Sequence, residues 1–204
     1  LTNVDELFQY LVELGQHPRY LSDTETVLER IGHFLDQENQ SLFDQFRAEG
    51  LSNRDASKRI AEQLDIRRIL QRAAKRWDGG YTMGGMIGCG DAFVARDPNG
   101  IRPVYYYACD EYVVVASERP AIATVFGIAY DQIKEVGHGH VVSIKANGTV
   151  TEKAFTEAGE KKSCSFERIY FSRGNDPDIY RERLALGDLI VPKILEAVNH
   201  DLEN

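Results

Sequence analysis

Residues 92–116 read AFVARDPNGIRPVYYYACDEYVVVA, and this stretch decides the fold class. Short runs rich in aromatic and β-branched residues, which favour strands, occupy 92–96, 104–109 and 112–116. The segment Asp97-Pro98-Asn99-Gly100 lies between the first two runs. Its proline fixes φ and its Asn-Gly step accepts a positive φ, so we expect a turn there. Short strands joined by tight turns predict an antiparallel sheet.

The same pattern continues on both sides of this stretch. Asn147-Gly148 has the composition of a two-residue hairpin turn. Further strands are expected at 81–88, 133–136, 140–144, 149–155 and 168–172.

Helical patterns occupy the first third of the chain. Asn3 begins a capping-box pattern, and Ser22 has the position of the cap of a second helix. The charged stretch 39–63 predicts two short helices that are broken at Gly50, with Ser52 capping the second.

Other helices are expected where apolar residues recur at helical spacing. These segments are 66–77, 120–126 and 178–199, and the last contains Pro192, where a bend is expected because a backbone donor is lost. Helices that flank a meander of antiparallel strands indicate an α+β fold.

The composition describes a folded, acidic chain. Its 204 residues suit one domain, or one domain with an appendage. The formal net charge is −8 and no basic stripe stands out, so no nucleic-acid partner is expected. No membrane partner is expected either, because no run approaches the ~18 apolar residues of a membrane helix. Cys89, Cys109 and Cys164 form no C-x-x-C pair and suit a reducing cytoplasm.

Motifs of known chemistry are scarce in this sequence. The glycines at 84, 85, 88 and 90 lie in and after an expected strand with no helix behind them, so close packing is favoured over a nucleotide loop. His138 and His140 have a spacing that can place both rings on one face. No third ligand is evident nearby, so we favour an exposed hairpin entrance over a metal site.

Asp23 allows two interpretations. A carboxylate in the first turn of a helix is stabilised by the positive end of the helix dipole, by ~0.3–1 kcal/mol. The same position leaves a carboxylate that a ligand ammonium can approach. The residue pattern alone does not decide between the two.

Several stretches, in chain order, carry a family resemblance. They are Ser22-Asp23-Thr24-Glu25, the segment 96–103 (RDPNGIRP), the segment 115–118 (VASE), the segment 164–173 (CSFERIYFSR) and the pattern Tyr180-x-x-Arg183-x-x-Leu186-Gly187. Together they resemble the glutaminase half of the amidophosphoribosyltransferase family. The turn at 96–103 also resembles asparagine-synthetase-type glutaminases, whereas 164–173 points to the phosphoribosyl branch.

The resemblance implies a fold and a domain organisation. It implies an incomplete four-layer αββα sandwich of the N-terminal-nucleophile hydrolase type. Residues 1–176 would form a partial glutaminase domain with a helical insert at about 38–78. Residues 177–204 would form a helix that leads toward a phosphoribosyltransferase domain absent from this chain.

The resemblance also implies a reaction. In this family a cysteine at the mature amino terminus attacks glutamine, its α-amino group acts as base, and an Asn-Gly pair forms the oxyanion hole. Ammonia then displaces pyrophosphate from phosphoribosyl pyrophosphate, in the first step of purine synthesis. The cysteine and the Asn-Gly pair are expected upstream of residue 1. This chain alone is therefore expected to be inactive.

Few residue roles transfer to this chain. Asp23 matches the family acid that contacts the α-amino group of glutamine. Cys164 aligns with a cysteine that ligates a [4Fe–4S] cluster in some members, a cluster that needs four thiolates. Asn99 and Arg102 are expected to tie the turn to neighbouring carbonyls. Ser117 and Glu118 are expected near the glutamine site, without an assigned role.

The expected cofactors and partners follow from the same resemblance. No cofactor is expected within this chain; a [4Fe–4S] cluster and Mg²⁺ belong to the full-length parent. Glutamine and phosphoribosyl pyrophosphate are the expected substrates, the latter through the absent domain. A homo-oligomer is expected, because a truncated sheet edge and apolar patches favour association. The alternatives are a glutaminase domain for another acceptor, such as aspartate, and a non-catalytic binding module.

Overall fold

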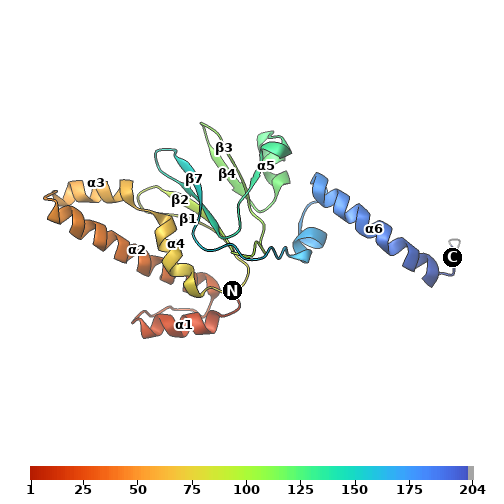
Figure 1. Cartoon of the computed structure of the whole chain (residues 1–204), viewed down its shortest axis with the longest axis horizontal. Coiled ribbons are helices and arrows are strands. Elements are labelled where there is room, and N and C mark those ends of the chain that lie inside the picture. The colour runs from red at the N-terminus through yellow and green to blue at the C-terminus, as the bar shows by residue number, and fades with distance from the viewer. Residues whose placement is uncertain (202–204) are drawn as a thin grey trace.

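The computed structural model describes residues 1–201. The last three residues of the segment expected at 177–204 lie outside the described part. Figure 1 shows α1–α4 gathered on one side of the strands, α5 on the other side, and α6 extending away from both.

Helices α1–α4 occupy the first third of the chain. They are α1 (Val4–Glu13), α2 (Asp23–Ala48), α3 (Asn53–Gln63) and α4 (Ile66–Ala73). Ser22 caps α2 by accepting the Glu25 N–H at 3.2 Å, and Ser52 caps α3 in the same way, as the sequence predicts. Asn3 precedes α1 but its side chain makes no cap hydrogen bond. It binds the backbone of Arg76 and Asp78 instead, so the predicted capping box is wrong.

The strands form two antiparallel sheets. The first has the order β1-β2-β6-β7, with β1 (Thr82–Met86), β2 (Ala92–Arg96), β6 (His140–Ile144) and β7 (Val150–Ala154). The second has the order β4-β3-β5, with β3 (Tyr105–Ala108), β4 (Val113–Ala116) and β5 (Lys134–Glu135). The α+β class predicted from the sequence is confirmed.

The alternation of side chains along the strands creates three apolar clusters. Phe93 faces the cluster shared with helices α1–α4, whereas its neighbour Val94 faces the cluster between the sheets. Tyr106 also faces the space between the sheets, whereas Tyr105 and Tyr107 pack against the third cluster beneath α5 (Arg119–Phe126). A period of two places successive residues on opposite faces, so each sheet separates two apolar layers.

Two predicted segments differ from the structure. The first of the two short helices expected in 39–63 is the continuation of α2, because the buried or half-buried apolar stripe of Phe34, Leu42 and Phe46 runs on without a breaker. A strand is predicted at 168–172, but residues 168–171 belong to the π-helical segment Glu167–Phe171 and Ser172 follows it. Strand propensity expresses fit to a half-buried pleated surface, and here Ile169, Tyr170 and Phe171 are more than half exposed.

Helix α6 (Pro177–Ala197) runs through Pro192 and buries only Ile179. Most of its other apolar side chains are solvent-exposed, among them Leu184, Leu189 and Ile190. Across residues 1–201, none of the helices combines the length and the apolar character that crossing a bilayer requires.

Candidate functional site

The turn after β2 is built around a buried carboxylate. Asp97 is fully buried, and it accepts the backbone N–H groups of Asn99 and Ile101 at 3.0 Å each and of Arg102 at 3.1 Å. Gly100 has a φ of +61°, and the ring of His138 fills the space that a Cβ at Gly100 would need. The turn is therefore held rigidly from inside.

Arg96 supports the turn from the other side. Its guanidinium donates to the carbonyl oxygens of Arg102 at 2.8 Å, Val136 at 2.7 Å and Gly100 at 3.1 Å. From the sequence, we expect ties to carbonyls from Asn99 and Arg102. Asn99 does reach the Glu160 carbonyl at 3.0 Å, but Arg102 pairs with the Glu167 carboxylate at 2.6 Å instead.

Asp23 lines a cavity of about 760 Å³, which we call the Asp23 cavity. The cavity lies between the amino-terminal half of α2 and strand β1, and the rigid turn contributes Arg102 and Pro103 to its wall. Ser117 and Glu167 complete that wall. Residues that are far apart in sequence are thus brought together, and the stretches that carry the family resemblance contribute Asp23, Thr24, Arg102, Pro103, Ser117 and Glu167.

The Asp23 carboxylate is half exposed at the start of α2. Its side chain lines the cavity and remains 53% exposed. The position in the first turn of α2 stabilises the ionised carboxylate through the helix dipole. An anionic group here is open to a cationic ligand.

The glycines of β1 allow close packing along the cavity floor. A Cβ at Gly85 would lie 2.5 Å from the Phe93 ring, whereas a Cβ at Gly84 would meet nothing closer than 3.8 Å. Gly85 is therefore a close-packing position, as expected from the sequence.

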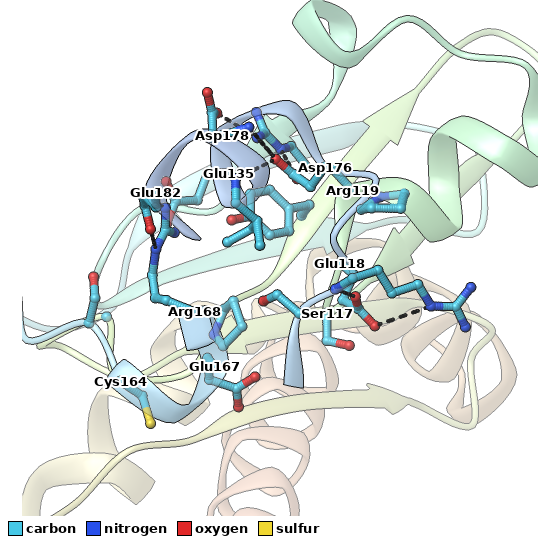
Figure 2. A pocket seen from close by; sticks show the side chains of 18 of the residues that line it. Ser117, Glu118, Arg119, Glu135, Cys164, Glu167, Arg168, Asp176, Asp178 and Glu182 are labelled. Carbon is cyan, nitrogen blue, oxygen red and sulfur yellow. Dashed lines mark hydrogen bonds and ion pairs between the residues drawn. The ribbon is translucent and has the colours of Figure 1, made fainter. Parts of the chain in front are cut away.

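A second cavity, of about 420 Å³, adjoins the first and has a charged lining. Figure 2 shows Arg119 directed toward Asp176 and Asp178, and Arg168 directed toward Glu182. Hydrogen bonding to Asp176, partly opposed by burial, raises the pKa of Arg119 above its ordinary value. Glu118 lines this second cavity and accepts the Arg173 N–H at 2.8 Å. Its neighbour Ser117 lines both cavities.

The cysteines do not gather into a metal site. Cys164 is half-buried and lines the second cavity, Cys89 lies in the turn between β1 and β2, and Cys109 is exposed after β3. Within residues 1–201, His, Cys, Asp and Glu side chains form no group of three or more that can hold a metal ion. The described residues do not fit a [4Fe–4S] cluster by themselves, and the role predicted for Cys164 stays a prediction.

The two histidines have separate structural surroundings. His138 packs against Gly100, and burial, with Arg96 nearby, lowers the pKa of His138. His140 Nδ1 lies 3.1 Å from the carboxylate of Glu152 on β7. Both rings are partly buried, so the exposed position expected from the sequence differs from the structure.

The comparisons with known proteins lead to one family. No family model matches the chain. The amidophosphoribosyltransferase of Pseudomonas aeruginosa is 28% identical over an alignment of 218 positions that covers 100% of this chain and 38% of that protein. The Escherichia coli amidophosphoribosyltransferase is 29% identical over 194 positions, which cover 91% of the chain and 33% of that protein.

A solved structure agrees with the sequence relatives. The glutamine phosphoribosylpyrophosphate amidotransferase from B. subtilis, complexed with ADP and GMP, superposes with a TM-score of 0.61 at 25% identity. The superposition covers 86% of this chain and 31% of that one. The chain thus spans roughly a third of the length of the proteins it resembles, since it covers 38% and 33% of the two curated relatives.

Proposed function

Since this chain is related to the amidophosphoribosyltransferase family, we propose that its residues form part of the glutamine-binding unit of such an enzyme. The parent would transfer the amide nitrogen of glutamine to phosphoribosyl pyrophosphate. The purine pathway and a cytoplasmic location are part of the same proposal. The matched segment covers the whole chain, which supports a single functional unit.

The observation that carries the proposal is the exposed carboxylate of Asp23. It lines the Asp23 cavity, lies in the first turn of α2, and its side chain is 53% exposed. The α-amino group of an amino acid is an ammonium group of opposite charge, which can donate hydrogen bonds to this carboxylate. We therefore assign Asp23 to the α-ammonium group of glutamine. Charge-assisted hydrogen bonds of this kind are stronger than neutral ones.

The nucleophile is proposed to lie outside this chain. A thiol can attack the side-chain amide of glutamine only from within the cavity, where a nearby amine accepts its proton and ammonia leaves. None of the residues that line the Asp23 cavity in the described part of the chain is a cysteine. We infer that residues 1–204 alone do not release ammonia from glutamine.

The architecture fits the same proposal. The structure has four layers in succession, which are helices α1–α4, one sheet, the other sheet and helix α5, with one apolar cluster between each neighbouring pair. From this order we infer the αββα layering of N-terminal-nucleophile hydrolases. Residues 1–176 would form the glutaminase unit, with 38–78 as its helical insert. The segment from 177 onward would connect to the unit that binds phosphoribosyl pyrophosphate and Mg²⁺.

Replacement of Asp23 tests the assignment. In the complete gene product, Asp23→Asn should raise the KM for glutamine about ten- to a hundredfold, because a charged hydrogen bond is worth ~1.5–3 kcal/mol. Steady-state ammonia release measures the effect. Asp5→Asn is the matched control, since Asp5 also lies in the first turn of a helix but outside the cavity. A KM that is unchanged in Asp23→Asn would refute the assignment.

A second comparison tests the reaction as a whole. The complete gene product should release pyrophosphate from phosphoribosyl pyrophosphate in a glutamine-dependent manner, whereas the 204-residue chain should release neither ammonia nor pyrophosphate. Ammonia transfer to aspartate would favour the asparagine-synthetase type. Ammonia release by the 204-residue chain would overturn the placement of the nucleophile.

A further inference from the structure

The start of α6 is held by two arginines that come from different parts of the chain. Arg119, the first residue of α5, donates to Asp176 at 2.9 Å from Nε and at 2.5 Å from Nη2. The same Nη2 reaches Asp178 at 2.5 Å. Arg168 forms a two-pronged pair with Glu182, one turn further along α6. We call these contacts the two-arginine clamp.

The clamp fixes the direction of α6 as well as its position. Asp176 is buried, and it also caps α6 by accepting the N–H groups of Asp178 at 2.9 Å and Ile179 at 3.4 Å. Arg119 therefore binds the residue that caps the start of the helix. Because α6 buries only Ile179, apolar packing contributes little to its orientation. The polar contacts of residues 176–183 set the orientation of α6 instead.

Each arm of the clamp is joined to the wall of the Asp23 cavity through its sequence neighbours. Ser117, two residues before Arg119, lines that cavity. Glu167, directly before Arg168, lines it too and pairs with Arg102 at 2.6 Å. Figure 2 shows Ser117 and Glu167 across the second cavity from the carboxylates of α6. Any rotation of α6 that pulls on the two arginines therefore pulls on two elements of the same wall.

We propose that Arg119 and Arg168 are positioning residues that transmit the orientation of α6 to the wall of the Asp23 cavity. The coupling is mechanical, because it joins the orientation of α6 to the position of the cavity wall. Only the identity of the ligand in that cavity rests on the proposed function. Because coupling between two sites is reciprocal, a ligand that orders the wall also tightens the seating of α6. Events at α6 thereby change affinity in a cavity whose ligand never touches that helix.

The first test measures backbone amide exchange in the 204-residue chain. The double variant Arg119→Met, Arg168→Met should speed exchange at residues 178–183 and also at 101–102 and 117–118 in the cavity wall. Exchange in the helix α4 core, at Ile69 and Leu70, should not change. Arg181→Met is the matched control, because Arg181 pairs with Asp178 within α6 and is itself largely exposed.

A conservative double variant separates positioning from loss of folding. Arg119→Lys with Arg168→Lys keeps both charges but loses the planar two-pronged geometry, so it should exchange at rates between those of wild type and the Met variant. Faster exchange at 178–183 with an unchanged wall would overturn the coupling. Unchanged exchange at 178–183 would overturn the clamp.

The second test uses glutamine kinetics in the complete gene product. The Met double variant should raise the KM for glutamine at least about fivefold, the lower end of typical coupling between sites, and should change kcat much less. Arg181→Met should leave both values unchanged. An unchanged KM in a double variant whose α6 is loosened would overturn the coupling. If the wild-type gene product lacks glutaminase activity, the proposed function fails while the exchange data still decide the clamp.

Discussion

At the scale of single residues, Glu152 joins the two sheets through one carboxylate. Its Oε1 accepts the Gly137 N–H at 2.8 Å and lies 3.1 Å from His140 Nδ1, while its Oε2 accepts the Tyr106 hydroxyl at 2.9 Å. Burial favours the protonated acid, but the hydrogen bonds from Gly137, His140 and Tyr106 outweigh it and lower the pKa of Glu152. Burial and the same carboxylate raise the pKa of Tyr106 to about 12.

This network predicts a specific dependence of stability on pH. A carboxyl whose pKa is lower in the folded state than in the unfolded state stabilises the fold above the unfolded value, and the stabilisation is lost as the pH falls through the folded value. Glu152→Gln should therefore destabilise the protein at pH 7. The difference from wild type should shrink as the pH falls below the ordinary value of 4.5. Urea unfolding at a series of pH values measures it.

Glu13→Gln serves as the control for this series, because Glu13 is an exposed residue at the end of α1. Its unfolding free energy should follow wild type at every pH. A Glu152→Gln deficit that stays constant from pH 7 to pH 3 would show that packing, and not the charge of the carboxylate, accounts for its contribution.

The site shows how far single residues can be predicted. Asp23 could be singled out, because a carboxylate in a first helical turn is visible as a pattern. Arg96 and Asp97 could not, because their roles depend on burial and on backbone groups that only the folded turn presents. The one sequence feature that points to these two residues is their position as an adjacent charged pair directly before Pro-Asn-Gly, at the end of an apolar strand. No sequence pattern predicts the role of Arg119, because its partners lie more than fifty positions away.

At the scale of elements, the glycines of β1 allow a direct test of close packing. A Cβ at Gly85 would come within 2.5 Å of the Phe93 ring, in the largest apolar cluster. Gly85→Ala should therefore lower the free energy of unfolding by about 1–3 kcal/mol, the usual cost of overpacking. Chemical denaturation of the purified chain measures this change.

Gly84→Ala is the matched control for Gly85→Ala. It changes the same strand by the same methyl group, but its Cβ would make an ordinary contact at 3.8 Å. Its effect should stay within about 1 kcal/mol of wild type, in the stabilising direction, since alanine restricts the unfolded chain. In a double-mutant cycle, Phe93→Leu should remove part of the Gly85→Ala penalty. Equal effects of the two glycine substitutions would contradict the packing argument.

At this scale, elements that are set by a local sequence pattern are predicted correctly, whereas elements that are set by contacts with distant residues are not. The turns at Asn99-Gly100 and Asn147-Gly148 and most strands follow from turn chemistry and alternation. The π-helical segment Glu167–Phe171 does not, because its ion pairs with Arg102 and Glu182 override a strand-like composition. Helix α2 is longer than predicted, because the many charged residues between its apolar positions make the continuous apolar stripe difficult to recognise in the sequence.

At the scale of the whole molecule, the apolar surface is distributed unevenly. Three clusters bury the faces of both sheets, and helices α1–α4 cover one side of this stack. Helix α6 projects away from it, as Figure 1 shows. Leu189 is 73% exposed, and Ile190 and Ile194 are about half exposed. Contiguous exposed apolar surface of this kind marks a site of association.

The 204-residue chain should therefore self-associate through α6 as its concentration rises. Replacing Leu189, Ile190 and Ile194 by glutamine keeps the helix propensity but removes the apolar surface, so the sedimentation coefficient should become independent of concentration. Val125→Gln is the control, because Val125 is 74% exposed but lies on α5. If wild type sediments as a monomer at high concentration, or if the triple variant associates as strongly as wild type, α6 is not the surface responsible. Since the two-arginine clamp sets the direction of α6, loosening it should also weaken association without removing any apolar side chain.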